Sequence, residues 1–203
     1  LIRGGCEVIT GGNHSFSKSE ILDSIETLPF LLRPDNMEPQ NIGQTSVTKR
    51  CRDLRIGIYN LYGNVFMDNS CGEMMERLGA WIAQDRSDIR IVDLHGEATA
   101  EKLSAFYMYR DQLNALIGTH THVPTADEMV VDGCAYISDV GMCGVAQSII
   151  GRDIDEVLVG IREHKRTRYT VAEGRAVLNA VLLEIDEQSR RTTAITRIQK
   201  YED

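Results

Sequence analysis

The sequence lacks the features of membrane proteins and of nucleic-acid-binding proteins. No apolar run approaches the length of about 20 residues that crosses a bilayer, and the start shows no basic segment followed by an apolar one. Basic residues are also few, since 22 Lys and Arg stand against 30 Asp and Glu for a net charge of −8. Because binding to a phosphate backbone depends on clustered positive charge, we expect neither stable nucleic-acid binding nor membrane insertion.

The sequence also lacks a cysteine framework. Its five cysteines form an odd set with no C-x-x-C spacing, and they are scattered over unrelated segments. This pattern fits neither a set of disulfides nor a zinc knuckle. We therefore expect free thiols and a cytoplasmic location.

The composition is that of an ordinary globular domain, with 42% apolar and 26% charged residues and no repeat or linker. Apolar stretches of strand length alternate with stretches of helical period, which predicts a layered α/β fold. The chain begins at Leu1 and runs at once into a strand pattern. We expect residues 1–203 to form a single domain whose first strands are missing.

The pattern predicts individual elements along the chain. Strands are expected over residues 6–10, 54–59, 89–94, 113–118, 129–131, 134–137, 176–185 and 192–198. Helices are expected from a capping box at Ser17 and Glu20 to just before Phe30, and over residues 74–82, 99–109 and 153–164. In the last of these helices we expect Ile154, Val157, Leu158 and Ile161 to face inward.

Four of the five histidines directly follow apolar strand-like runs: His14, His95, His120 and His122. A single histidine at such a place is more often a structural residue. Ligand sites in α/β folds gather at strand ends, so histidines at three separate strand ends favour a functional site.

Two local motifs point to metal chemistry. In the segment from Gly118 to His122, extended backbone directs the imidazoles of His120 and His122 to the same side. Two imidazoles so placed can serve one metal ion, or one each of two ions. Asn13 follows a glycine pair, and its amide oxygen is either a hard neutral ligand or simply part of a left-handed turn.

The order of these motifs resembles the calcineurin-like metallophosphoesterase superfamily, and more narrowly its YmdB-type 2′,3′-cyclic-nucleotide phosphodiesterases. The likeness covers nearly the whole chain. It is carried by Ile9-Thr-Gly-Gly-Asn-His14, Arg33-Pro34, Val92-Asp-Leu-His-Gly-Glu-Ala-Thr-Ala-Glu-Lys102, Gly118-Thr-His-Thr-His-Val-Pro-Thr-Ala-Asp-Glu128 and Ala135-Tyr-Ile-Ser-Asp-Val-Gly-Met142. The resemblance implies a metallophosphoesterase-type four-layer α/β/β/α sandwich, here truncated at its N-terminus. It also implies a hydrolase that acts on cyclic nucleotides or similar small phosphodiesters through a dinuclear metal centre.

The resemblance assigns a role to each candidate residue. It implies that Asn13, His95 and His120 bind one divalent ion, that His122 binds a second, and that His14 is the catalytic acid or base. Iron or manganese is the expected metal, with zinc as a further option. Nearby carboxylates are expected either to orient the imidazoles or to be solvated surface groups: Asp93, Glu97, Asp127 and Asp139.

One departure from the family pattern matters for activity. Family members begin with strands that end in Gly-Asp and Glu-Asn, whose carboxylates hold the two metals, and these segments are absent here. We therefore expect this chain to hold one ion tightly, to be weakly active or inactive alone, and to self-associate through an exposed sheet edge. The alternative is an inactive member that acts as a binding or regulatory module. A zinc amidohydrolase is a weaker reading, because that barrel needs about 250 residues.

Overall fold

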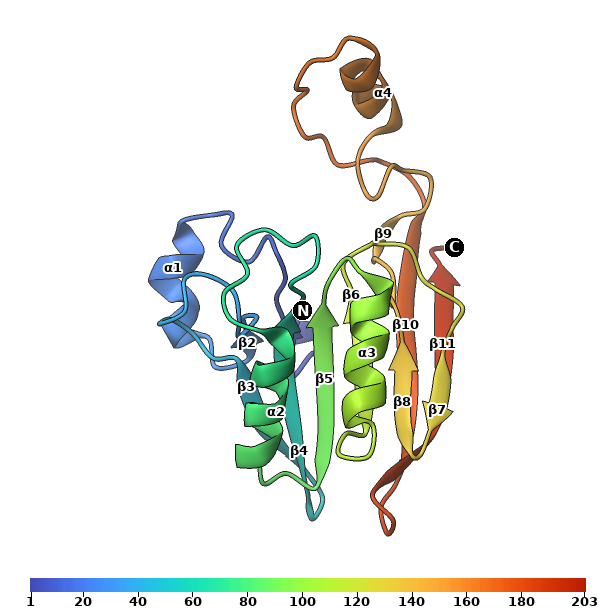
Figure 1. Cartoon of the computed structure of the whole chain (residues 1–203). Helices are drawn as coiled ribbons and strands as arrows, with labels where there is room; N and C mark the ends of the chain where they lie inside the picture. The colour runs from blue at the N-terminus through green and yellow to red at the C-terminus, as the bar shows by residue number, and fades with distance from the viewer.

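The computed structural model describes all residues 1–203 and contains four α-helices, two 3-10 helices and three β-sheets (Figure 1). The largest sheet has six strands in the order β3-β4-β5-β6-β8-β7. Its strands are β3 (Ser46–Cys51), β4 (Leu54–Tyr62), β5 (Ile89–His95), β6 (Ala115–Thr119), β7 (Met129–Val131) and β8 (Cys134–Ile137). The four central strands β4, β5, β6 and β8 run parallel, while β3 and β7 pair antiparallel at the edges.

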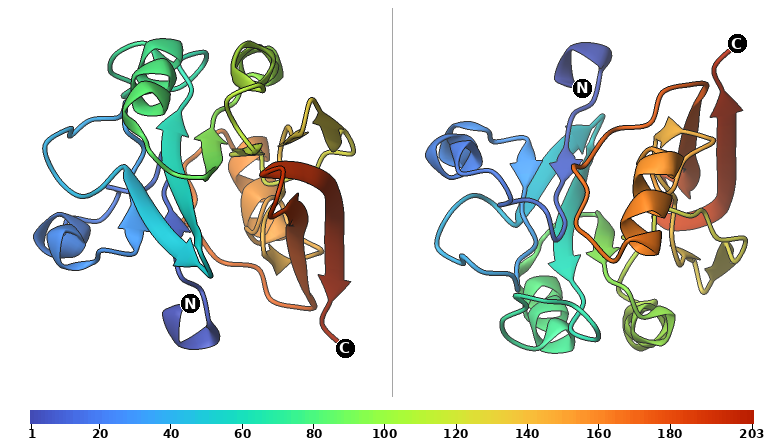
Figure 2. Two further views of the ribbon diagram at one scale, coloured as in Figure 1. Left: turned by 90° about the horizontal axis from the view of Figure 1, so that it is seen from below. Right: turned by 90° about the horizontal axis from the view of Figure 1, so that it is seen from above.

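Two helices cover one face of this sheet. In Figures 1 and 2, α2 (Met74–Gln84) and α3 (Thr99–Tyr109) lie side by side on it. The apolar residues of α2 recur at helical spacing, so Met74, Leu78 and Ile82 all point into the core and are buried. They pack with residues of α3 and of the sheet in one cluster of 13 buried side chains. Burial of this apolar area is the main term that stabilises the sheet and its two helices.

A second sheet lies beside the β7–β8 end of the first. It is antiparallel, with the order β11-β10-β9, and its strands are β9 (Gly144–Val145), β10 (Ala176–Asp186) and β11 (Arg191–Tyr201). Strand β11 contacts both β7 and β8, and the Thr192 amide donates to the Gly133 carbonyl at 2.9 Å. The fold is therefore mixed α/β with a central mixed sheet.

The N-terminal part of the chain forms a smaller unit to one side (Figure 1). The two-residue strands β1 (Ile9–Thr10) and β2 (Leu31–Leu32) pair in parallel. A 3-10 helix, Ile2–Gly4, precedes them, and α1 (Glu20–Ser24) continues into a second 3-10 helix, Ile25–Thr27. Strand β1 is thus shorter than the predicted strand over residues 6–10.

Most of the predicted elements are confirmed. Helix α3 and the β7–β8 hairpin have the predicted bounds, and the other strands differ from prediction by a few residues at their ends. The five cysteines are free, as expected. None of the helices combines the length and the apolar character needed to cross a membrane.

The predicted capping box at Ser17 is wrong. Residues 13–18 form turns, and α1 begins only at Glu20 with Ser19 at its N-cap. The Ser17 hydroxyl instead lies 3.3 Å from Nδ1 of His14. A side chain that pairs with a nearby imidazole does not cap the helix, which explains the later start.

The predicted inward face of the last helix is also wrong. Helix α4 (Ile154–Arg162) begins as expected at its N-cap Asp153, whose carboxylate accepts from the Glu156 amide at 2.8 Å. None of its residues is buried, and Ile161 is 63% exposed. The reason is its position on an arm that projects away from both sheets (Figure 1), so no other layer covers its apolar residues.

Candidate functional site

The predicted histidines lie at the carboxyl ends of parallel strands. His95 is the last residue of β5 and pairs in register with Thr119, the last residue of β6, so His120 follows at the same edge. Gly12 and Asn13 follow strand β1, and they reach this edge from the N-terminal unit. A side chain on Gly12 would have its Cβ only 2.3 Å from Cε1 of His95, so only glycine allows this approach.

Three donor atoms converge at this edge. Nε2 of His95 lies 3.0 Å from Oδ1 of Asn13 and 3.1 Å from Nδ1 of His120. The His95 ring stacks in parallel with Tyr62, with 6.0 Å between ring centroids, which fixes its plane. His95 therefore contacts two other predicted site residues, Asn13 and His120, although Asn13 and His95 are 82 positions apart in sequence.

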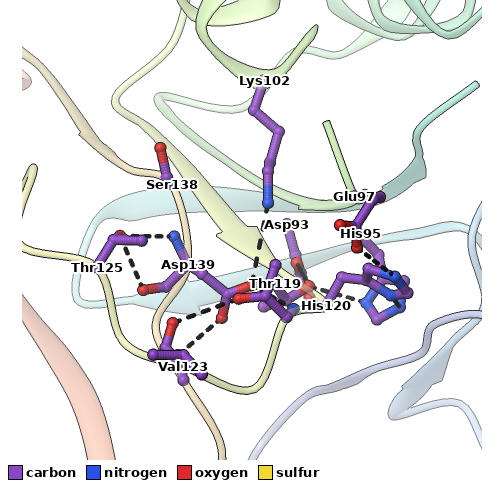
Figure 3. Close-up of polar contacts among 12 residues, drawn as sticks. Asp93, His95, Glu97, Lys102, Thr119, His120, Val123, Thr125, Ser138 and Asp139 are labelled. Carbon is purple, nitrogen blue, oxygen red and sulfur yellow. Dashed lines mark hydrogen bonds and ion pairs between the residues drawn. The ribbon is translucent and has the colours of Figure 1, made fainter. Parts of the chain in front are cut away.

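Hydrogen bonds behind the two imidazoles fix their tautomers (Figure 3). The Thr119 hydroxyl donates to Asp93 at 2.8 Å, so its oxygen accepts from Nδ1–H of His95 at 3.0 Å. Nε2 of His120 lies 3.1 Å from the Glu97 carboxylate and therefore carries the proton. In this assignment Nε2 of His95 and Nδ1 of His120 both present lone pairs.

The Asn13 amide completes an unusual arrangement of acceptors. Its nitrogen lies 3.4 Å from Nε2 of His14 and donates to it, so its oxygen faces His95. The acceptors of Asn13 and His120 thus both face the lone pair of His95 Nε2 at about 3 Å with no proton between them. Such an arrangement is repulsive unless a cation lies among the three atoms.

The electrostatics of the site keep these imidazoles neutral. Burial, reinforced by the neighbouring His120 ring, lowers the pKa of His95 to about 3. Burial also lowers the pKa of His120, against the opposing charge of Glu97. The same effect raises the pKa of the Asp93 carboxyl to about 6, against hydrogen bonds from Thr10 and Thr119. At neutral pH Asp93 is therefore ionised and both rings are neutral, which is the form that binds metals.

The donor set fits a divalent ion in geometry but not in charge. Neighbouring ligands of an octahedral ion at about 2.1 Å are about 3.0 Å apart, which matches the separations of Nε2 of His95 from Asn13 and from His120. No group of three or more His, Cys, Asp or Glu side chains is placed to hold a metal ion. The three donors are two imidazoles and one amide, and all are neutral.

His14 and His122 lie beside this group without joining it. Nδ1 of His122 lies 3.2 Å from the Ile150 carbonyl and donates to it, so its Nε2 is an acceptor. Both rings are exposed, and both line a cavity of about 600 Å³ with Asn13 and His120. The backbone φ angles of His120 and His122 are 134° and 69°, so the segment that follows β6 bends there and is not extended as the sequence predicts.

A buried ion pair lies behind the segments that contain Thr121 and Gly141 at this edge (Figure 3). Nζ of Lys102 lies 3.9 Å from Oδ2 of Asp139, and both side chains are almost fully buried. The Asp139 carboxylate also accepts from the amides of Thr121 at 2.7 Å and Gly141 at 2.8 Å. Burial lowers the pKa of Lys102, against the attraction of Asp139.

The carboxylates expected to orient imidazoles divide into two pairs. Glu97 contacts His120 directly and Asp93 acts through Thr119. Asp139 contacts only backbone near the histidines, and Asp127 accepts from the Ser138 amide at 3.2 Å.

Sequence reasoning missed Thr119 and Lys102. The signal for Lys102 was available, because it lies on the same helical stripe as the buried residues Ala105 and Phe106. No local signal marks Thr119, whose role depends on contacts across the sheet.

Comparison with known proteins defines the class. The chain is 35% identical over 207 residues to the 2′,3′-cyclic-nucleotide 2′-phosphodiesterase of Bacillus subtilis, covering 100% of this chain and 78% of that protein. A crystal structure of a Mycoplasma pneumoniae phosphatase superposes with a TM-score of 0.88 at 32% identity, over 97% of this chain and 73% of that one. A hypothetical protein from Thermus thermophilus gives a TM-score of 0.93 at 27% identity, over 100% and 79%. These relatives place the chain in the class of phosphoesterase enzymes, as the sequence predicts.

The chain belongs to the family of YmdB-like proteins, whose family model matches residues 1–198. The resemblance stated from the sequence is thereby confirmed.

Proposed function

We propose that this protein hydrolyses small phosphodiesters, 2′,3′-cyclic nucleotides among them, at the site of Asn13, His95 and His120, with the help of divalent metal. The observation that carries the proposal is the convergence of three lone pairs at separations of 3.0 and 3.1 Å. The name of the Bacillus relative supports the substrate class.

Asn13, His95 and His120 would hold one ion, and His122 is the available donor for a second. Bound divalent metal supplies stabilisation of phosphoryl charge and acidification of a bound water. Iron, manganese and zinc all accept imidazole ligands. Three neutral protein donors leave positions for water and substrate, as catalytic metal sites require.

His14 is the proposed catalytic acid or base. Its ring is exposed to the cavity and lies next to Asn13, and Ser17 at 3.3 Å from Nδ1 orients it. Nδ1 faces Ser17, so Nε2, whose partner in the structure is the Asn13 amide nitrogen at 3.4 Å, would exchange that contact for the leaving oxygen of the ester and transfer a proton there. Proton transfer by a positioned side chain contributes typically 10²- to 10⁴-fold to rate.

The proposal includes a metallophosphoesterase-type sandwich of two sheets flanked by helices. It is supported by the contact of β11 with β7 and β8, and by the two helices on the outer face of the larger sheet.

Turnover with defined metal content tests the proposal. The chain is stripped with a chelator, reconstituted separately with Mn²⁺, Fe²⁺ or Zn²⁺, and assayed with 2′,3′-cyclic AMP, while metal per chain is measured by elemental analysis. We expect weak hydrolysis to a nucleoside monophosphate that depends on added metal and is lost in His120→Ala. Metal-independent hydrolysis, or metal-dependent hydrolysis unchanged in His120→Ala, would place the reaction at another site.

One observation favours the alternative of a binding or regulatory module. All three converging donors are neutral, so charge compensation for a second ion is weak at this site. Nucleotide binding by the metal-loaded chain without any turnover would establish that alternative.

A further inference from the structure

The arm between β9 and β10 reaches over the candidate site. Residues 146–175 leave the sheet, form α4, and return to β10 (Figures 1 and 2). The Ile150 carbonyl accepts from His122 at 3.2 Å, which ties the arm to the histidine edge. As a result Arg152 and Tyr169 line the same cavity of about 600 Å³ as His14 and His122.

Tyr169 is held in place by its surroundings but remains largely exposed. The Arg152 guanidinium lies over the ring, 4.9 Å from its centroid, and that guanidinium is held by Glu156 and by Thr167 at 3.3 Å. The next residue, Thr170, donates its amide to Glu156 at 2.8 Å, which fixes the backbone. Tyr169 is nevertheless 61% exposed, so much of the side chain stays accessible despite the contact with Arg152.

The cavity has the size and charge for a nucleotide. Its volume falls within the range of about 300–1,000 Å³ that small-molecule sites span. Two cationic side chains, Lys18 and Arg152, and one carboxylate, that of Glu97, line it, while Arg152 also pairs with Glu156. Aromatic side chains next to basic groups are the usual way in which proteins stack unpaired bases.

We propose that Tyr169 stacks against the base of a nucleotide whose phosphate lies at His14, so that the arm gives the site its preference for nucleotides over other phosphodiesters. This inference rests on the proposed function and adds a base subsite to it. Tyr169 is a binding residue in this scheme, and Arg152 positions its ring.

Two substrates that differ only in the presence of a nucleoside test the proposal: 2′,3′-cyclic AMP, and glycerol 1,2-cyclic phosphate, which has the same cyclic phosphate without a base. We expect Tyr169→Ala to lower about tenfold the ratio of kcat/KM for 2′,3′-cyclic AMP to kcat/KM for glycerol 1,2-cyclic phosphate, mainly by raising KM for the nucleotide. Tyr169→Phe should restore this ratio. The matched control is Tyr107→Ala, since Tyr107 is 51% exposed and also lies under an arginine, Arg110 at 5.4 Å, but on α3. This control should leave the ratio unchanged.

The outcomes separate this inference from the proposed function. Hydrolysis of both substrates with a ratio that Tyr169→Ala changes less than twofold overturns the base subsite and leaves the phosphodiesterase in place. Hydrolysis of neither substrate by the wild-type chain overturns the proposed function, and calorimetric titration with 3′-AMP then decides the inference. Binding about tenfold weaker in Tyr169→Ala supports stacking, whereas equal binding or none by the wild-type chain overturns it.

Discussion

Replacing Lys102 with methionine tests the buried charge behind the histidines. The Lys102 and Asp139 side chains are only 1% and 2% exposed, with 3.9 Å between Nζ and Oδ2. Methionine fills a similar volume without the charge, so the substitution leaves the Asp139 carboxylate buried with no cation beside it. Because Asp139 also accepts from the amides of Thr121 and Gly141, both turns at the site depend on it.

The expected loss of stability is large. Removing one partner of a buried ion pair costs about 3–5 kcal/mol. Two backbone donors remain on Asp139, so we expect the lower end, about 3 kcal/mol. For a chain of this length, that loss lowers Tm by about 6–12 °C. Urea unfolding followed by circular dichroism, in the presence of a chelator, measures the free energy of unfolding.

Two controls separate the buried charge from other effects. Lys102→Met combined with Asp139→Asn should recover part of the loss, because the second change removes the unpaired charge. Lys165→Met breaks an exposed pair with Glu163 and should change stability by less than about 0.5 kcal/mol. The reasoning is refuted if Lys102→Met unfolds within about 1 kcal/mol of wild type, or if the double variant is no more stable than the single one.

Three further predictions concern the imidazoles. Thr119→Val removes the hydroxyl that links Asp93 to His95, and it should weaken metal binding about 10- to 100-fold as measured by competition with a chelator. The control Thr48→Val on β3 should leave metal affinity unchanged. Equal metal affinities of Thr119→Val and the wild-type chain would show that the link has no effect. His14→Ala should lower turnover far more than metal content, and His120→Ala should lower both; equal metal loss in the two variants would contradict their assigned roles. Burial holds the pKa of His95 at about 3, whereas in the unfolded chain this ring takes up a proton below about pH 6.5. The free energy of unfolding therefore falls as the pH drops from about 6.5 towards 3. In metal-free protein the His95 ring should lower the free energy of unfolding by about 2 kcal/mol between pH 7.5 and 5. The His95→Asn variant should lack this part of the pH dependence. Identical pH profiles of stability for the two proteins would refute the argument.

The elements that the sequence predicts well are those whose information is local. The α3 helix and the β7–β8 hairpin were predicted with their bounds, because the apolar period and the Asp132–Gly133 turn need no distant partner. The histidines at strand ends follow the same logic, since parallel strands place their carboxyl ends at one edge. Knowing the strands was therefore enough to bring His95 and His120 together.

The features that the sequence did not predict depend on tertiary contacts. The apolar pattern of α4 is a good helix signal, but it carries no information on whether another layer exists to cover it. Ser17 has the spacing of a cap, yet His14 competes for its hydroxyl. Tyr169 gives no signal at all, because its place at the site depends on the path of the arm.

If the proposed function holds, the arrangement of charge at the site would let a chain with a net charge of −8 bind an anion. The carboxylates of Asp93 and Glu97 contact the groups that support the converging donors. Asp93 accepts from the Thr119 hydroxyl, which contacts His95, and Glu97 contacts Nε2 of His120. Negative charge at that distance would partly compensate a cation bound as proposed, and would raise the basicity of its imidazole ligands without occupying its coordination positions. Those positions would stay free for water and for phosphoryl oxygens. With an ion bound as proposed, the charge nearest the substrate would be that of the ion and of the cationic side chains that line the cavity, so the acidic surface would not repel the substrate from the site.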